Sequence, residues 1–266
     1  MSTRLERAFA DMKAQERTGL VAFISGGDPT LERSAEVIRA VDDGGADVIE
    51  IGVPFSDPLA DGPEIQRSSE RALRAGTTLR GVLDMVGDIR TTVAAPLVLF
   101  SYANPVVRFG VDAFAARAAE VGVDGVLLLD LPIEEAGPTR DVLVRHGLAP
   151  IFLLSPTTTP ERIARADALG QGFLYAISRL GVTGVREQVA TDAQELVARI
   201  RSHARLPLAL GFGLSRPEHV QDVGRYADAA VVGSALVAQI AKHGDSPRLA
   251  DEVRGFVRWL RGGAAA

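Results

Sequence analysis

Two carboxylates lie close together in the sequence but in different surroundings. Glu50 lies inside the apolar run Val48–Gly52, which is typical of a buried strand, and Asp61 follows on a loop rich in Pro and Gly. Burial of a carboxylic acid disfavours its charged form and raises its pKa. We therefore expect a raised pKa for Glu50 and a better-solvated, ionised Asp61. Such a pair suits one acid for proton transfer and the other for holding a positive charge. In the alternative interpretation, Glu50 only pairs with an arginine and Asp61 only caps a helix.

Eight short apolar runs recur along the chain and alternate with amphipathic stretches. The runs are nearly continuous in Val, Ile and Leu, as in strands buried on both faces: Leu20–Ser25, Val48–Gly52, Leu97–Phe100, Gly125–Leu129, Ala149–Leu154, Phe173–Ile177, Leu208–Gly211 and Ala229–Gly233. Helices are predicted between them, among others at Leu31–Val41, Asp112–Val121, Glu134–His146, Asp192–His203 and Pro247–Leu260. This order predicts an α/β fold, a single (β/α)₈ TIM barrel over residues 1–266. An open doubly wound sheet is the alternative, although no Gly-x-Gly-x-x-Gly follows the first run.

Other helices are predicted at the margins of this repeat. Arg4–Gln15 predicts an extra helix before the first strand, which could plug the barrel floor. A short helix should open at Ser234 after the eighth strand. The segment from Ser215 to Glu218 has the spacing of a capping box at a helix start, with a proline near the first turn.

The barrel prediction places both carboxylates on the functional side. In such barrels the chemistry lies at the carboxyl ends of the strands, on the loops that lead into the helices. Glu50 lies in the second strand near that end, and Asp61 lies on the loop that follows. This position favours acid–base catalysis by carboxylates over a merely structural role.

The residue inventory disfavours several other chemistries. The chain has no cysteine, and its two lysines, Lys13 and Lys242, lie away from the strand ends, which disfavours a Schiff base. All four histidines fall in or next to helical stretches, so we predict no metal site. A net charge of −5 disfavours nucleic-acid binding. With no apolar run near the roughly 20 residues of a membrane helix and no signal peptide, a cytoplasmic protein is expected.

Glycines in the last two strand–helix loops predict a phosphate site. Gly211-Phe212-Gly213 ends the seventh strand, and Gly233-Ser234 ends the eighth and opens a helix. Backbone N–H groups at such a helix start bind phosphate without a lysine.

The loop from Ser178 to Gln188, with two glycines, could close over a substrate as a lid. Apolar side chains near the strand ends could form a pocket for an aromatic ring: Phe23, Phe100, Tyr102, Leu127, Leu129 and Tyr175.

Several motifs together closely resemble the tryptophan synthase α subunit family. The longest runs from Glu50-Ile51-Gly52 through Pro54-Phe55-Ser56-Asp57-Pro58-Leu59-Ala60-Asp61-Gly62-Pro63 to Ile65-Gln66. Shorter matches reach from the first strand to the last: Gly27-Asp28-Pro29, Tyr102-Ala103-Asn104-Pro105, Asp130-Leu131-Pro132, Ser178-Arg179, Gly181-Val182-Thr183-Gly184, Gly211-Phe212-Gly213 and Gly233-Ser234. The resemblance therefore covers nearly the whole chain.

The resemblance implies a barrel enzyme that cleaves indole-3-glycerol phosphate to indole and glyceraldehyde 3-phosphate in tryptophan biosynthesis, without a cofactor of its own. It implies that Glu50 is the general acid/base and that Asp61 holds the indole N–H. The remaining implied roles are an indole pocket and closed-site contacts from Phe23, Ile65, Phe100, Leu127, Leu129, Tyr175, Thr183 and Phe212, and phosphate binding by Gly184, Gly213, Gly233 and Ser234.

The resemblance also implies a partner. This is a β subunit that carries pyridoxal phosphate, in an αββα heterotetramer with an internal tunnel for indole. The loop from Pro54 to Pro58 and the segment near Asn104 would face it.

Phe100 and Leu129 are bulkier than the Leu and Ala expected at these positions. Alternative functions are another phosphate-binding barrel isomerase or epimerase, and a non-catalytic barrel that activates a partner subunit.

Overall fold

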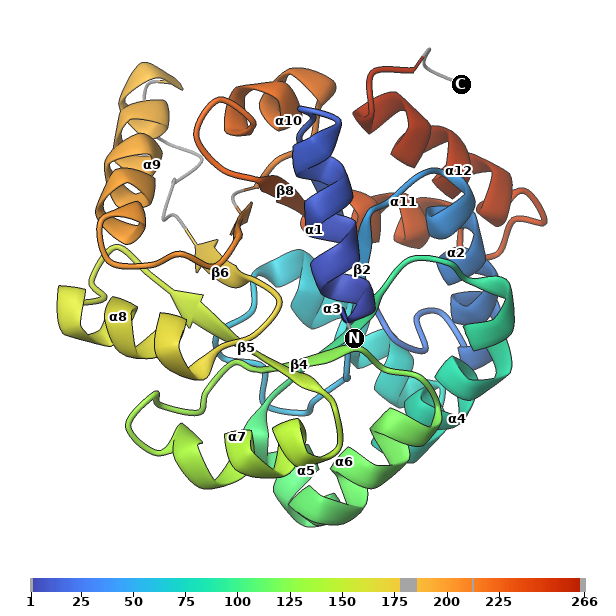
Figure 1. The fold of residues 1–266 in the computed structure, drawn as a ribbon. Coiled ribbons are helices and arrows are strands. Elements are labelled where there is room, and N and C mark those ends of the chain that lie inside the picture. The colour runs from blue at the N-terminus through green and yellow to red at the C-terminus, as the bar shows by residue number, and fades with distance from the viewer. Residues whose placement is uncertain (1, 178–185, 212, 264–266) are drawn as a thin grey trace.

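Eight parallel strands close into a barrel in which each strand pairs with its neighbours in sequence and the first pairs with the last (Figure 1). The computed structural model describes residues 2–177, 186–211 and 213–263, with the backbone alone for 186–191. The strands are β1 Gly19–Ser25, β2 Val48–Gly52, β3 Leu97–Ser101, β4 Gly125–Leu128, β5 Ala149–Leu154, β6 Leu174–Ile177, β7 Leu208–Gly211 and β8 Ala229–Val232. The predicted fold class is confirmed, and every predicted strand lies within one residue of an observed one.

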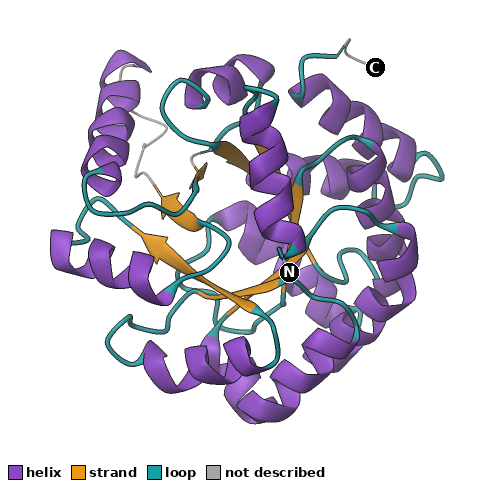
Figure 2. Ribbon diagram, viewed as in Figure 1, coloured by secondary structure: helices purple, strands orange, loops and turns teal. Residues whose placement is uncertain are grey.

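Helices surround this ring of strands (Figure 2). They are α1 Arg4–Ala14, α2 Leu31–Asp43, α3 Pro63–Arg74, α4 Leu79–Ile89, α5 Ala103–Phe109, α6 Val111–Glu120, α7 Ala136–Arg145, α8 Pro160–Leu169, α9 Arg186–Arg201, α10 Pro217–Val223, α11 Ser234–His243 and α12 Leu249–Leu260, with a short 3₁₀ helix at Arg90–Thr92. None of the helices within the described residues combines the length and apolarity needed to cross a membrane.

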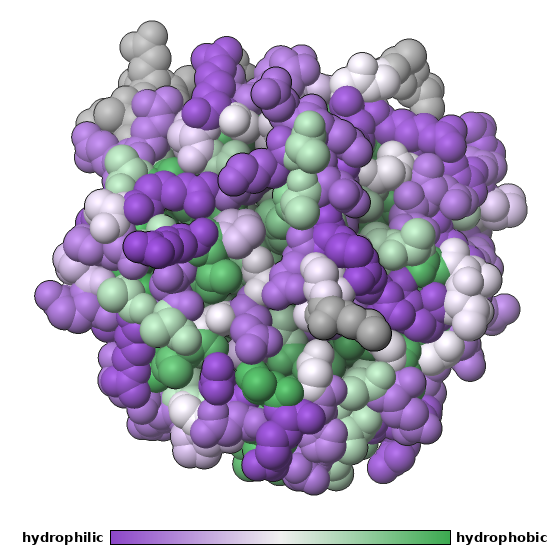
Figure 3. Space-filling model, viewed as in Figure 1, coloured by the Kyte–Doolittle hydropathy of each residue, from purple (hydrophilic) through white to green (hydrophobic). Residues whose placement is uncertain are grey.

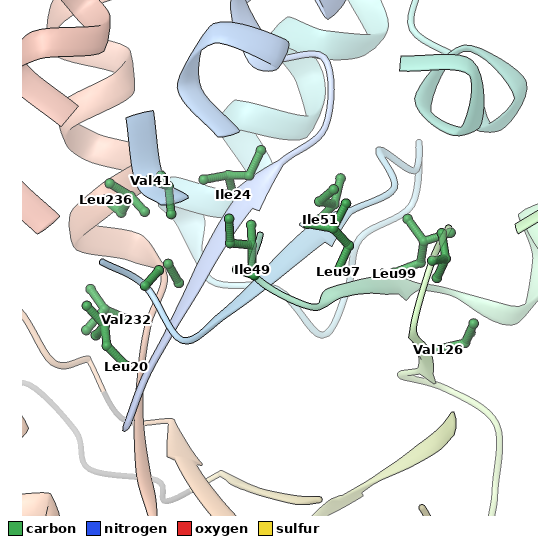
Figure 4. Packing of buried hydrophobic residues seen from close by; sticks show 14 of the residues in the cluster. Leu20, Ile24, Val41, Ile49, Ile51, Leu97, Leu99, Val126, Val232 and Leu236 are labelled. Carbon is green, nitrogen blue, oxygen red and sulfur yellow. The ribbon is translucent and has the colours of Figure 1, made fainter. Parts of the chain in front are cut away.

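Side chains alternate along each strand between two apolar layers. In β2, Ile49 and Ile51 belong to the layer between strands and helices, together with Val41 of α2 and Leu236 of α11 (Figure 4). Val48 belongs to the layer inside the barrel. Because successive strand residues point to opposite faces, Glu50 must point into the barrel as Val48 does. The strand pattern alone thus aims this carboxylate at the barrel interior.

Helix α1 closes the amino-terminal end of the barrel. Leu5, Phe9 and Met12 are buried in the interior layer, and the Phe9 ring lies 5.2 Å from that of Phe173 at the start of the sixth strand. A Cβ on Gly19 would lie 2.0 Å from the Met12 sulfur, so this approach requires glycine. Figure 1 shows α1 lying across the ring of strands, which confirms the predicted floor helix. Hydrophilic side chains dominate the face around it (Figure 3).

The predicted capping box at Ser215 is wrong. Helix α10 begins one residue later: Arg216 is its N-cap, in extended conformation, and no side chain caps it. The Ser215 N–H instead donates to Nδ1 of His219 at 3.3 Å. Pro217 explains the difference, because a residue that precedes proline is disfavoured in helical conformation, and the box requires Arg216 to be helical.

Candidate active site

Glu50 lies in the middle of the barrel wall, without a partner for its charge among the described residues. It pairs in register with Phe23 of β1 and Val98 of β3 and is fully buried. Neither carboxylate oxygen has a hydrogen-bond partner among the described residues, so the alternative of a structural pair with an arginine is not observed there. Desolvation raises the pKa of Glu50 to about 8. At neutral pH the group is therefore mostly a carboxylic acid that can give up a proton.

Asp61 is half-buried on the loop between β2 and α3. Desolvation raises the pKa of Asp61 to about 6, against a lowering contribution from the Tyr102 hydroxyl, which donates to Oδ2 at 3.3 Å. Asp61 is better solvated than the fully buried Glu50, as expected, and a pKa one unit below pH 7 leaves about ten ionised molecules to one protonated. Asp61 does not cap α3, whose N-cap is Gly62 without a side-chain bond. The two acids thus differ in charge at neutral pH.

Tyr102 holds the Asp61 loop from the neighbouring strand end. Besides its bond to Asp61, its oxygen accepts a hydrogen bond from the Ala60 N–H at 3.1 Å, and its ring lies 5.0 Å from that of Phe55. Burial is the main cause that raises the pKa of Tyr102 to about 12, so its proton stays available for donation. The sequence placed this residue only among possible pocket walls. Its position directly after the third strand was the signal for a closer role.

A cavity of about 220 Å³ opens beside these residues and combines an apolar wall, Asp61 and glycine-rich backbone. We call it the site cavity. Its lining is Phe23, Ala60, Asp61, Gly62, Ile65, Phe100, Leu129, Tyr175, Ile177, Gly211, Gly213, Val231, Gly233 and Ser234. The Phe100 ring lies edge-on to Phe23 at 5.4 Å and to Tyr175 at 6.4 Å. This arrangement offers a flat apolar surface next to a carboxylate.

Most of the predicted site residues that the structure describes meet at this cavity. Phe23, Ile65, Phe100, Leu129, Tyr175, Gly213, Gly233 and Ser234 all line it. Leu127, in the interior layer, and Glu50 are both fully buried and do not line it. Thr183, Gly184 and Phe212 lie outside the described residues, as does most of the predicted lid. Sequence reasoning gave no role to Ile177, whose position as the last residue of β6 was the available signal.

Two glycines make room for the aromatic walls. A Cβ on Gly211 would lie 2.6 Å from the Tyr175 hydroxyl oxygen, and one on Gly52 would lie 2.6 Å from Cζ of Phe23. Tyr175 is nearly buried, and desolvation, with a smaller contribution from the charge of Glu50, raises its pKa well above the usual value. The Tyr175 side chain therefore lies within electrostatic reach of Glu50, and the backbone of β7 fixes its place.

The start of α11 presents free backbone donors to the cavity. Gly233 is its N-cap and Ser234 its first residue, and no side chain caps this helix end. Gly213, at φ +62, has open space where a side chain would lie. Uncapped N–H groups and the positive end of the helix dipole favour an anion at such a place. No group of three or more His, Cys, Asp or Glu suited to a metal ion is found in the described part of the chain.

A larger hollow than the site cavity, a polar groove of about 1030 Å³, lies at the amino-terminal end of the barrel. Several of its charged groups are paired. Arg4 and Arg90 bind the nearly buried Asp124 at 2.9 and 3.4 Å, and Asp124 accepts a hydrogen bond from the Leu97 N–H. In such barrels this end serves stability, whereas sites form at the opposite end. We therefore assign the function to the smaller site cavity.

Comparison with known proteins decides the family. The family model for the tryptophan synthase alpha chain matches residues 9–257. The chain belongs to this family. It is 46% identical over 264 residues to the tryptophan synthase alpha chain of Solibacter usitatus, with 99% of each chain covered. It is 47% identical to that of Geotalea uraniireducens, with 99% of this chain and 98% of the relative covered.

Solved structures of tryptophan synthase alpha chains share the same barrel. The alpha subunit of Legionella pneumophila superposes with a TM-score of 0.91 at 34% identity, with 98% of each chain covered. A chain of tryptophan synthase from M. tuberculosis, in an aminoacrylate- and BRD0059-bound form, gives 0.89 at 33% identity over the full length of both chains. The alpha-chain fold therefore extends over the whole described chain.

Proposed function

We propose that Glu50 and Asp61 are the acid–base pair with which this chain cleaves indole-3-glycerol phosphate to indole and glyceraldehyde 3-phosphate. Membership of the tryptophan synthase alpha chain family makes the chain a lyase of tryptophan biosynthesis. The roles of single residues are our proposal. One observation carries them: mostly ionised Asp61 lines the apolar cavity, and Glu50, buried without a charge partner among the described residues, pairs in register with Phe23 of the cavity wall.

Cleavage begins with a proton delivered to the indole ring. The bond between C3 of the ring and the glycerol chain breaks as a retro-aldol step, and C3 must first accept a proton so that the ring leaves as neutral indole. Glu50, protonated at neutral pH, is suited to give this proton. Once ionised, it can accept the proton of the side-chain hydroxyl as the carbonyl of glyceraldehyde 3-phosphate forms. The proton count of the enzyme is then restored.

Asp61 stabilises the charge that this protonation creates. Protonation at C3 places positive charge on the ring nitrogen, and an ionised carboxylate near the N–H lowers the energy of that state. The half-buried position of Asp61 strengthens the interaction, because the cavity excludes much of the screening water. The aromatic and aliphatic lining, with Phe23, Phe100 and Leu129, would hold the ring.

The phosphate of the substrate is assigned to the uncapped start of α11. Gly233 and Ser234 supply backbone N–H groups there, and Gly213 lets the β7 loop approach closely. Binding energy from this remote group would fix the ring against the two acids. Thr183 and Gly184, outside the described residues, are assigned to the closed site and to the phosphate only by the family resemblance. Under this proposal, the chain requires no cofactor of its own.

The proposed partner is a β subunit that carries the pyridoxal phosphate, in an αββα assembly. Exposed apolar side chains support this at the predicted contact surface. Leu59, on the loop that contains Pro54–Pro58, is 83% exposed, and Val107, on α5 near Asn104, is 64% exposed. Exposed large apolar groups mark interaction surfaces when they cluster. Both lie in segments that follow the carboxyl ends of strands, β2 for Leu59 and β3 for Val107.

Turnover of indole-3-glycerol phosphate tests the proposal. The purified chain should release indole, and E50Q and D61N should each lose at least about a hundredfold in kcat, the scale of general acid–base and electrostatic catalysis. The matched controls are E32Q on α2 and D11N on α1, both exposed and remote from the cavity. Near-wild-type turnover by folded E50Q or D61N would reject the roles assigned to these residues.

A further inference from the structure

Helix α3 forms one wall of the site cavity but has little apolar attachment to the barrel. Its buried residues are Ser68, Ser69 and Ala72, all small. Its two large apolar side chains, Ile65 and Leu73, are only half-buried, and Ile65 faces the cavity. Apolar burial normally fixes a helix on a domain, at about 25 cal/mol for each Å² removed from water. Such small side chains supply little of it. Another interaction must therefore help to set the position of α3, beside its packing against β1 and α11.

A buried ion pair supplies this attachment. Asp28, on the loop after β1, is 1% exposed and accepts two hydrogen bonds from Arg71 of α3, from Nε at 2.8 Å and from Nη2 at 2.7 Å. The Ser68 hydroxyl donates to the same carboxylate at 2.8 Å. A bidentate Arg–carboxylate pair fixes direction as well as distance. The loss of one partner would leave a buried charge uncompensated, so the pair resists displacement.

The other end of the connection is tied to the strands that carry the site. The Gly26 N–H donates to the Gly52 carbonyl at 2.8 Å, which joins the loop before Asp28 to the end of β2. A Cβ on Gly27 would lie 2.2 Å from Oγ1 of Thr77, so the loop also packs tightly against the residues that follow α3. Asp28 is therefore held in the same frame as Glu50 of β2.

From α3 the connection continues to Asp61. Gln66 donates through Nε2 to the Asp61 carbonyl at 2.8 Å and to the Pro58 carbonyl at 3.2 Å. The helix begins at Pro63, two residues after Asp61, and Ile65 lies in its first turn. A shift of α3 would therefore move both the carboxylate loop and the Ile65 wall. The Tyr102 hydroxyl holds only the opposite side of this loop.

We propose that the ion pair of Asp28 with Arg71, completed by Ser68, is a positioning device that sets Asp61 and Ile65 relative to Glu50. None of the three residues lines the cavity, and the side chains of Ser68 and Arg71 are engaged with Asp28, so they act through α3 and not on substrate. The inference rests on the proposed function of Glu50 and Asp61. It adds that the placement of the ring end of the substrate depends on this pair. Binding of the phosphate end, by the loops after β7 and β8, does not depend on it.

R71K tests the device with a change that keeps the charge. Lysine carries one ammonium group and cannot reproduce the fork of two parallel bonds. The matched control is R74K on the same helix, because the ion pair of Arg74 with Glu70 has the same 2.7 Å distance but is exposed. Wild-type turnover of indole-3-glycerol phosphate is measured first, and its absence would reject the proposed function rather than this inference.

We expect R71K to lose about ten- to a hundredfold in kcat, as small displacements of a catalytic group do, while R74K stays within twofold of wild type. The affinity for glycerol 3-phosphate, which carries the phosphate but no ring, should not change in R71K. S68A, which removes one bond and keeps the pair, should lose a few-fold in kcat and carries the test if R71K does not fold. Folding is checked by circular dichroism at the assay temperature.

Two results would overturn the inference. In the first, folded R71K, or S68A in its place, turns over as fast as R74K, so the pair does not position the site. In the second, glycerol 3-phosphate binding weakens in parallel with turnover, which indicates general loosening of the barrel instead of a displaced ring site.

Discussion

At the scale of residues, the site depends on two acids that burial affects unequally. Glu50 has neither a hydrogen bond nor a counter-charge among the described residues, so desolvation acts on it without opposition. Asp61 is less buried and is partly relieved by the Tyr102 hydroxyl. With pKa values of about 8 and about 6, the protonated acid and the ionised acid coexist between these limits. The rate should therefore follow a bell-shaped pH profile.

Y102F should move one limb of that profile. The Tyr102 hydroxyl stabilises the charged form of Asp61, so its removal raises the pKa of Asp61 above about 6. Because the reaction needs ionised Asp61, the acid limb of kcat/KM should shift to higher pH, while the alkaline limb set by Glu50 stays in place. The profile of kcat/KM from pH 5 to 9 measures both limbs. Y226F, which removes the hydroxyl of a half-buried tyrosine before β8, is the control, and an unmoved acid limb in Y102F would contradict this role.

The carboxylates could be predicted from the sequence, but their surroundings could not. The apolar neighbours of Glu50 in sequence indicated its burial and its raised pKa. The loop of Asp61, rich in Pro and Gly, indicated better solvation than that of Glu50. The extent of its burial could not be predicted, because sequence does not show that Tyr102 and Ile65 converge on it from another strand end and from α3. Leu127 was expected in the pocket from its place near a strand end, yet it lies below the cavity in the interior layer. One position along a strand decides such a difference.

At the scale of elements, strands were predictable here because both of their faces are buried. Continuous runs such as that of β2 need no alternation to stand out. Helix α3 did not stand out, because its buried face consists of Ser68, Ser69 and Ala72 and gives no apolar periodicity. Its attachment by Asp28 and Arg71 joins residues 43 positions apart, which a local pattern does not contain. Elements that carry the site can thus be those with the weakest hydrophobic signal.

G211A tests how one strand shapes the site. An added Cβ at the end of β7 would lie 2.6 Å from the Tyr175 hydroxyl oxygen, so the ring must move away from its place near Glu50. We expect kcat/KM for indole-3-glycerol phosphate to fall about tenfold or more, since misplaced groups in a site cost rate. G137A in α7 is the matched control, because nothing lies within 4 Å of its added Cβ. It should retain activity at a small cost in stability, because a residue that precedes proline, here Pro138, is disfavoured in helical conformation. Equal activity of the two variants would show that Tyr175 tolerates the contact.

At the scale of the whole molecule, the barrel keeps Glu50 buried, which lowers the stability of the folded protein as pH rises. The strands bury Glu50 completely between layers of Val, Leu and aromatic side chains, and α1 closes the interior from below. A carboxyl group whose pKa is raised in the folded state binds protons more tightly there than in the unfolded chain. Stability is therefore lost as pH rises from the unfolded value of 4.5 through about 8. This loss is the stability cost of keeping an acid protonated at neutral pH.

Comparison of E50Q with wild type across pH isolates this cost. Glutamine does not titrate, so any constant effect of the amide cancels when the difference in Tm between the two proteins is followed from pH 5 to pH 8. Each pKa unit corresponds to about 1.4 kcal/mol, which gives about 4 kcal/mol over this range. The Tm of E50Q minus the Tm of wild type should accordingly rise by roughly 10 °C between pH 5 and pH 8. Thermal scans by circular dichroism at pH 5, 6, 7 and 8 measure it, with E32Q as the exposed control. A Tm difference that is flat with pH would mean that Glu50 is not held as a buried acid, and the proton donor of the proposed reaction would then have to be another group.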